Sequence, residues 1–93
     1  MLYRVQPTKR YQKSLKRLFG SGQFKLDELN VLIDMLMNAL PLPPQYQNHK
    51  LRGEYADCFE CHIKGDLLLI YHINIDTKTL TVVDIGTHSE LFG

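Results

Sequence analysis

Three closely spaced prolines, Pro41, Pro43 and Pro44, constrain the fold of this chain more than any other feature. Proline lacks the backbone N–H that a helix needs, and it disfavours helical geometry in the residue before it. Residues 41–48 are therefore expected to form an extended connector. Apolar residues before this connector recur with the period of a helix, and many of those after it alternate as in a strand. The chain thus divides into a helical first half and a strand-rich second half.

The first half is predicted to hold one short strand and two helices. Residues 2–6 alternate in polarity like a strand, and Thr8 is the expected N-cap of a helix over residues 9–19. The glycines of Gly20-Ser21-Gly22 break this helix, and a second one is expected from residues 25–27 to about residue 40. The first apolar stripe consists of Tyr11, Leu15, Leu18 and Phe19. The second consists of Leu29, Leu32, Ile33, Leu36 and Leu40, and Val31, Met35 and Met37 widen it enough to predict a helix covered on more than one side.

The second half is predicted to be a series of strands. They are expected at residues 49–53, 57–64, 67–73 and 79–85, with tight turns at Gly65-Asp66 and at residues 76–78 and a tail over residues 87–93. In the strand over 57–64, Phe59, Cys61 and Ile63 point one way, and Cys58, Glu60, His62 and Lys64 point the other. This order predicts an α+β fold, in which an N-terminal strand and a two-helix hairpin pack on an antiparallel-rich β-sheet in a single compact domain over residues 1–93.

Composition narrows the class of protein. Hydrophobic residues make up 44% of the chain and charged residues 23%, which is typical of a globular domain and not of a disordered chain. The apolar runs are too short to span a bilayer, so no membrane association is expected. The N-terminal residues lack the apolar segment of a secretory signal, which predicts a cytoplasmic location.

The positive charge is concentrated at the N-terminal end. Residues 1–26 carry seven basic side chains and no acidic ones, whereas residues 27–93 carry four basic and ten acidic ones. This asymmetry indicates either a polyanionic partner such as nucleic acid or a solvated helix face. The basic residues of the first helix are Lys9, Arg10, Lys13, Lys16 and Arg17.

Cys58 and Cys61 have the C-x-x-C spacing of some zinc and redox sites. Residues three apart in a strand point to opposite faces, and no second Cys/His pair stands at a suitable distance. The favoured interpretation is a buried Cys61 and a partly exposed Cys58, with no metal and no cofactor. A metal site of Cys58, Cys61 and His62 is the weaker alternative.

All four histidines follow residue 48, and three of them occupy strand ends or loops: His49, His62 and His88. His72 lies inside an apolar strand and is interpreted as structural. Histidine transfers protons near neutral pH, and metal-free RNA cleavage needs a base for the 2′-hydroxyl and an acid for the departing 5′-oxygen. A nearby cation would stabilise the charge of the transition state. Inert surface histidines and a metal site are the competing interpretations.

Four motifs then appear in order along the chain. They are Leu40-Pro41-Leu42-Pro43, Tyr46-x-x-His49-x-Leu51-x-Gly53, Cys61-His62-Ile63-x-x-Asp66-Leu67-Leu68-Leu69-Ile70-Tyr71 and Gly86-Thr87-His88-Ser89-Glu90-Leu91-Phe92-Gly93. Together they closely resemble the YafQ branch of the RelE/ParE superfamily of bacterial toxin–antitoxin toxins. The resemblance covers essentially the whole chain, most strongly from residue 40 onward.

The resemblance implies a ribosome-dependent endoribonuclease that cuts messenger RNA in the ribosomal A site. It also implies a small cognate antitoxin, and a toxin–antitoxin complex that contacts operator DNA. His49, His62, Asp66, His88 and Phe92 fall on the family's catalytic or substrate-contacting positions. The histidines and Asp66 are expected to handle protons or the phosphate, and Phe92 to stack on a base. The basic first helix would contact ribosomal RNA or the antitoxin.

Three positions depart from the family pattern as the resemblance presents it. Asp84 and Phe59 replace arginines, and Leu67 replaces a tryptophan. Loss of an arginine at position 84 removes a phosphate clamp, and Lys50, Arg52 or Lys64 are the predicted substitutes among substrate-binding residues. These departures motivate an alternative to the enzyme: a catalytically weakened module that binds antitoxin, ribosome or operator DNA.

Overall fold

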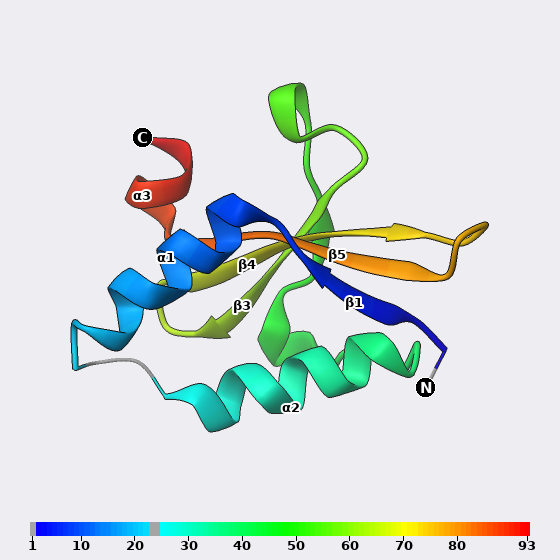
Figure 1. The fold of residues 1–93 in the computed structure, drawn as a ribbon, viewed down its shortest axis with the longest axis horizontal. Helices are drawn as coiled ribbons and strands as arrows, with labels where there is room; N and C mark the ends of the chain where they lie inside the picture. Colours follow the sequence, from blue (N-terminus) through cyan, green and yellow to red (C-terminus); the bar gives the residue numbers. More distant parts are fainter. Residues whose placement is uncertain (1, 23–24) are drawn as a thin grey trace.

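The computed structural model describes residues 2–22 and 25–93, and its strands form one mixed sheet in the order β1-β5-β4-β3-β2 (Figure 1). β1 (Arg4–Pro7) runs parallel to β5 (Thr79–Thr87). β5, β4 (Leu67–Asn74), β3 (Phe59–Lys64) and β2 (His49–Lys50) are paired antiparallel. The antiparallel-rich sheet is therefore confirmed, and the parallel β1 lies beside β5, the last strand of the chain.

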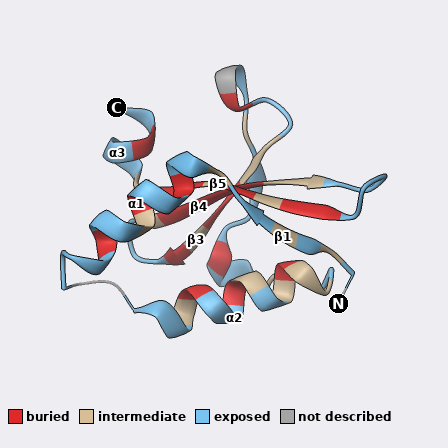
Figure 2. Ribbon diagram, in the orientation of Figure 1, coloured by how far each residue is buried: buried red, intermediate tan, exposed pale blue. Residues whose placement is uncertain are grey.

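Two long helices lie on one face of this sheet, as predicted. α1 (Lys9–Phe19) and α2 (Leu26–Met37) both contribute side chains to the larger hydrophobic core. Figure 2 shows their buried residues turned toward the sheet and their outer surfaces exposed. Two 3-10 turns, η1 (Pro44–Tyr46) and η2 (Gly53–Tyr55), interrupt the connecting segments.

Helix α1 begins where the sequence predicts. The backbone N–H of Tyr11 donates to the Thr8 hydroxyl oxygen over 3.0 Å, which satisfies one free donor of the first turn. Tyr11 and Leu18 are buried, but Phe19 is 55% exposed and does not belong to the core stripe. β1 ends opposite Val82, so the rest of β5 has no strand on that side, and α1 lies along it.

Helix α2 is shorter and less covered than predicted. It ends at Met37, and Ala39 follows with a left-handed φ of 54°. The expected end near residue 40 is wrong because the chain already turns ahead of Pro41, and Leu40 is 50% exposed. Val31 is 55% exposed, so the prediction of a helix covered on more than one side is also wrong.

The two faces of the sheet carry two separate cores. Cys61, Ile63 and Leu69 pack under the helices, while Leu68 and Ile70 pack with Tyr55, Leu91 and partly buried Cys58 on the opposite face. The predicted alternation of β3 is thus confirmed, and β4 is covered on both faces. The second core is the surface on which the candidate site stands.

The C-terminal segment differs from the predicted tail. β5 extends to Thr87, and residues His88–Phe92 form a third helix, α3. A capping box stabilises its start: the Thr87 hydroxyl accepts from the Glu90 N–H, and Glu90 accepts from the Thr87 N–H over 2.8 Å. The Thr-x-x-Glu spacing was the sequence signal for this helix.

The connecting segment is less extended than predicted. It contains η1, and Gln47 has a left-handed φ of 45°. The strand expected over residues 49–53 is reduced to β2, because η2 begins at Gly53. In Figure 1 the segment that carries η2 rises as a loop at the top of the view, and its Tyr55 belongs to the second core and contacts Phe92 of α3.

Candidate active site

Cross-strand register brings His49 and Glu60 together. They are direct partners in the β2–β3 ladder, and His49 Nε2 lies 2.6 Å from Glu60 Oε1. Glu60 is only 6% exposed, whereas the His49 ring is about half exposed. A proton on Nε2 therefore donates to a fixed carboxylate, and Nδ1 is left as the free acceptor. Glu60 thus orients His49, as second partners do in catalytic dyads.

Glu60 was not among the predicted site residues. The alternation of β3 placed it on the same face as His62, two residues away, which was the available signal. What the sequence did not supply was the pairing register that sets it against His49.

His62 follows Glu60 on that face, opposite Leu68 of β4. Its Nδ1 lies 3.3 Å from the carbonyl oxygen of Gly65, so a proton there leaves Nε2 open. Asp66 lies nearby in sequence, but the described contacts do not join it to His62. Asp66 instead lines a cavity of about 420 Å³ between the end of α1, the start of α2 and the β3–β4 turn. Lys64 lines the same cavity, with its Nζ 3.6 Å from Glu28.

His88 and Phe92 stand one turn apart on α3. Their ring centroids are 5.0 Å apart, and the Phe92 ring meets Tyr55 edge-on at 5.8 Å. Leu91 of the same helix is buried in the second core, which fixes α3 on the sheet. Phe92 keeps 38% of its surface exposed and is therefore accessible to a base.

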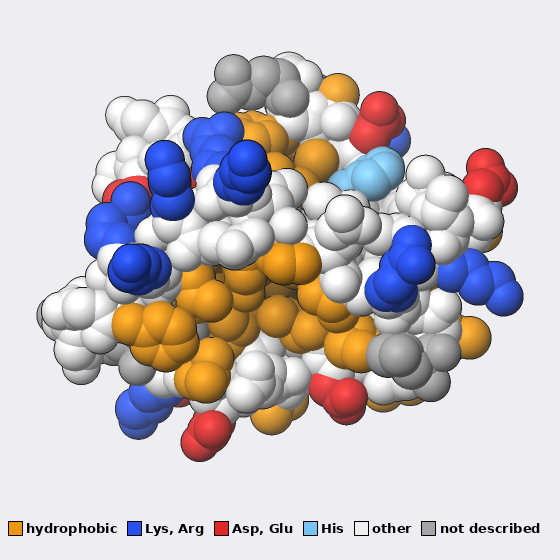
Figure 3. Space-filling view, in the orientation of Figure 1, with side chains coloured by type: hydrophobic (Ala, Val, Ile, Leu, Met, Phe, Trp, Pro, Cys, Tyr) orange, Lys and Arg blue, Asp and Glu red, His pale blue; other side chains and the backbone are white. Residues whose placement is uncertain are grey.

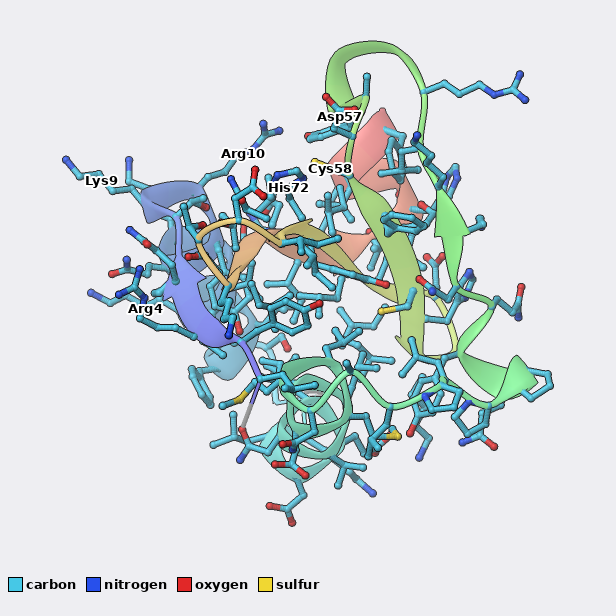
Figure 4. All side chains as sticks on the ribbon, turned by 90° about the vertical axis from the view of Figure 1, so that its right-hand side faces the viewer. Arg4, Lys9, Arg10, Asp57, Cys58 and His72 are labelled. Carbon is cyan, nitrogen blue, oxygen red and sulfur yellow. The ribbon has the colours of Figure 1, made fainter. Side chains whose placement is uncertain are left out.

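The predicted cations of the 50s segment project into solvent. Lys50 is opposite Phe59 at the edge of the sheet, and Lys50 and Arg52 are both exposed. The loop between them and β3 is tied down by His72, whose Nδ1 lies 2.7 Å from the Asp57 carbonyl oxygen. His72 thus has the structural role that its strand position predicted. Figure 4 shows it on the same side of the sheet as Cys58 and Arg10.

The basic residues of α1 are all exposed, and Figure 3 shows Lys and Arg side chains gathered over this helix. Arg10, Lys13 and Arg17 line a cavity of about 290 Å³ beside α3, together with Asp84 and Glu90. Arg17 pairs with Glu90 over 3.2 Å. The described lining of this cavity does not include Lys9 and Lys16, whose helical spacing places them on a different side of α1.

Asp84, the departure expected to remove a phosphate clamp, is a buried anchor. It is 3% exposed and accepts from the Ser14 hydroxyl over 2.6 Å and from the Ile85 N–H over 2.8 Å. Arg10 Nε lies 2.9 Å from its second oxygen. Position 84 therefore holds a cation from α1 beside the site instead of presenting one itself.

The two cysteines lie on opposite faces of the sheet, as predicted. Cys61 is fully buried under the helices, and burial raises the pKa of its thiol to about 12. Cys58 is partly buried on the other face, and burial raises its pKa as well. Within residues 2–22 and 25–93, no three His, Cys, Asp or Glu side chains are grouped closely enough to bind one metal ion.

Comparisons with known proteins agree with this architecture. The sequence model of a family described as "Bacterial toxin of type II toxin-antitoxin system, YafQ" matches residues 3–93. The chain is 32% identical over 90 residues to the "mRNA interferase toxin YafQ" of Escherichia coli K12, which covers 96% of this chain and 95% of that one. It is 56% identical over 46 residues to the "Putative toxin YafQ" of Haemophilus influenzae, a stretch that spans 45% of that protein.

Solved structures share the fold. A metal-bound toxin from Helicobacter pylori superposes with a TM-score of 0.89 and 41% identity, over 99% of this chain and 100% of the other. The toxin of the E. coli DinJ–YafQ toxin–antitoxin complex superposes with a TM-score of 0.84 and 31% identity, over the full length of both chains. In the described part of the chain, no helix has the length and apolar character needed to cross a membrane. The chain belongs to the YafQ family of bacterial type II toxin–antitoxin toxins.

Proposed function

We propose that this toxin is a ribosome-dependent endoribonuclease that cleaves messenger RNA. The observation that carries the proposal is the placement of three histidines on the face of the second core: His49 and His62 on neighbouring strands and His88 on α3. Relatives named mRNA interferases share this fold. Three histidines, one of them oriented by a buried carboxylate, supply the proton transfers that RNA cleavage needs.

The reaction we propose is attack of a 2′-hydroxyl oxygen on the adjacent phosphorus. The bond from phosphorus to O2′ forms, and the bond to O5′ breaks. One histidine removes the 2′-hydroxyl proton, and another protonates the departing 5′-oxygen, so the products are a 2′,3′-cyclic phosphate and a free 5′-hydroxyl. His49, oriented by Glu60, is suited to the base role because one ring nitrogen is already committed to a carboxylate. Bond cleavage here is assigned to proton transfer and not to a metal.

The remaining site residues are assigned supporting roles. Phe92, exposed beside His88, is proposed to stack on a base of the message. Asp66 at the β3–β4 turn is proposed to act with His62, and Lys50, Arg52 and Lys64 to contact the RNA backbone. The exposed Lys and Arg side chains of α1 are proposed to bind ribosomal RNA or the antitoxin.

The proposed partners follow from the relatives. A solved relative forms the DinJ–YafQ complex, and we propose that this toxin is likewise blocked by a cognate antitoxin. Contact with operator DNA is proposed through that complex, and the bacterial cytoplasm is the proposed site of action.

A cleavage assay tests the proposal. Purified toxin, either treated with EDTA and desalted or left untreated, is added to translating ribosomes, and message ends are mapped. Wild type is expected to cleave after either treatment, and His88→Ala and His49→Ala are expected to lose about 10²–10⁴-fold in rate. Lys78→Asn, at the remote β4–β5 turn, is the matched control for a surface change. If messages stay intact in the presence of the wild-type toxin, the proposed ribonuclease activity is wrong.

Asp84 favours one second candidate, a toxin-like module that binds without cleaving. Its carboxylate stands where the resemblance expects a cation. This candidate predicts that wild type co-sediments with ribosomes or binds the antitoxin, while messages stay intact even at a large excess of toxin. Cleavage by wild type that is lost in His88→Ala would exclude it.

A further inference from the structure

Arg10 occupies an unusual place for a residue at the start of a surface helix. Its side chain is 58% exposed, yet its Nε is paired over 2.9 Å with a carboxylate that is almost fully buried. That carboxylate, Asp84, is itself fixed by Ser14 and by the backbone N–H of Ile85. The Arg10 guanidinium is therefore paired with a carboxylate that is fixed in the sheet, and not with a flexible surface side chain.

A ring contact fixes the second side of the same guanidinium. The Arg10 carbon Cζ lies 5.7 Å from the centre of the Tyr55 ring, within the range of cation–π attraction. Tyr55 in turn meets Phe92, and Phe92 meets His88. Two ring contacts thus connect Tyr55, on which the guanidinium lies, to the α3 histidine. Figure 4 shows Arg10 on the side of the sheet from which the loop of Asp57 and Cys58 rises.

The outer half of the guanidinium remains available to a ligand. Arginine has five N–H donors, and the ion pair with Asp84 is made through Nε and not through Nη1 or Nη2. These nitrogens carry four N–H groups in a planar fork that matches two oxygens of a phosphate. The adjoining cavity of about 290 Å³ is lined by three cations and two carboxylates, so its lining carries a net positive charge.

We propose that Arg10 binds the RNA backbone at or next to the scissile phosphate, and that Asp84 is the positioning residue that aims it. This proposal rests on the proposed ribonuclease function and adds the cation that stabilises its transition state. Arg10 forms and breaks no covalent bond. It offers N–H groups to phosphate oxygens whose negative charge grows as O2′ attacks and before O5′ departs.

An acidic segment of the antitoxin is the competing ligand for the same basic face. The position of Arg10 favours RNA, because the residue is linked through Tyr55 and Phe92 to His88, and because Asp84 holds it against that end of the site. Lys13 and Arg17, farther along α1, lie on the same cavity and are placed to follow the backbone away from the cleaved bond.

The test is a double-mutant cycle on ribosome-bound message, with kcat and KM measured separately. Arg10→Ala is expected to lower kcat about 10- to 100-fold, and Arg10→Lys to lower it less, since the charge remains but the fork is lost. Asp84→Asn keeps an oxygen for Ser14 and removes the charge that holds Arg10, so kcat falls severalfold. The double variant is expected to match Arg10→Ala, because Asp84 acts on kcat through Arg10. Lys78→Asn removes a positive charge far from the site and is the control, expected to cleave like wild type.

The outcomes separate the two proposals. Cleavage by wild type and by Arg10→Ala with equal kcat would overturn the role of Arg10 and leave the ribonuclease function intact. So would multiplying effects of the two substitutions, or a loss confined to antitoxin affinity. If wild type itself leaves the message intact while still binding ribosomes, both proposals fail. Thermal unfolding of each variant, with Arg10→Lys as the mild substitution, guards against reading a folding defect as lost activity.

Discussion

Replacement of Asp84 by alanine should destabilise the fold by several kcal/mol. The substitution leaves the buried Ser14 hydroxyl without its acceptor, and a hydrogen bond to a charged group is worth about 1.5–3 kcal/mol. The Ile85 N–H loses this acceptor as well, which adds about 1 kcal/mol. The Arg10 pair adds at most about 1 kcal/mol, because the arginine is 58% exposed and solvent screens it. The expected loss is therefore about 3–4 kcal/mol.

Such a loss is large for a domain of this size. At about 0.05–0.15 kcal/mol per residue, the whole chain is stabilised by roughly 5–14 kcal/mol. Each kcal/mol shifts the midpoint by about 4–8 °C in small domains, so the thermal midpoint should fall by roughly 12–32 °C. Urea unfolding followed by circular dichroism measures the free energy directly, and an unchanged m-value confirms that the transition is comparable.

Two further variants make the reasoning refutable. Ser14→Ala should cost about 1–2 kcal/mol, and the double alanine variant should cost less than the sum of the two because they share one hydrogen bond. Arg10→Ala should cost less than about 1 kcal/mol. If Asp84→Ala lost less than 1 kcal/mol, or if Arg10→Ala lost as much as Asp84→Ala, the carboxylate would not be anchored from within the fold.

Three other predictions test separate parts of the structure. Tyr55→Phe should leave the free energy of unfolding unchanged or raise it by about 1 kcal/mol. The reason is that the Tyr55 hydroxyl is buried with no hydrogen-bond partner among the described residues. A clear loss of stability in urea unfolding would show that the hydroxyl has a partner. The Thr87 N–H holds the pKa of the Glu90 carboxyl below its usual 4.5. The Glu90 carboxylate therefore stabilises the fold above pH 4.5, and this stabilisation is lost as the pH falls through the lower pKa of the folded state. The stability difference between wild type and Glu90→Gln should vanish in acid, and a difference that grows in acid would contradict the lowered pKa. Cys61 is buried and its thiol has a pKa of about 12, so it should react with iodoacetamide only after unfolding. Labelling of the native protein should be confined to Cys58. Mass spectrometry of the labelled peptides identifies the cysteine that has reacted, and labelling of Cys61 in the native protein would contradict its burial.

Local patterns predicted most of the elements and failed where a boundary depended on neighbours. The 3.6-residue and 2-residue periods placed α1, β3 and β4 because each has one face or both faces in a core. The end of α2 was misplaced since leucine and methionine continue the apolar pattern beyond the point at which the backbone turns. Helix α3 was missed because five residues are too few for a period, although its capping box was visible in the sequence.

The candidate site was predicted as a set of residues, and their contacts were not. His49, His62 and His88 were selected for their chemistry and positions, and the fold places all three at the second core. The carboxylate expected to assist them was Asp66, chosen for its closeness to His62 in sequence. The carboxylate that touches a histidine is Glu60, because strand pairing brings together residues 11 positions apart, and no local pattern encodes that register.

Position 84 shows why a motif read along the chain misjudges charge in space. Taken alone, an aspartate where an arginine is expected removes one cation and adds one anion beside His88. In the fold, β1 stops opposite Val82, so α1 lies along the open edge of β5 and Ser14 and Arg10 meet Asp84 from about 70 residues away. The Asp84 carboxylate is fully engaged by Ser14 and Arg10. The Arg10 guanidinium that it holds faces Tyr55 and the basic cavity beside α3. The cation beside Asp84 therefore comes from α1 and not from β5. Its pairing with Asp84 cannot be found from the sequence without the parallel pairing of β1 with β5, which sets where α1 lies.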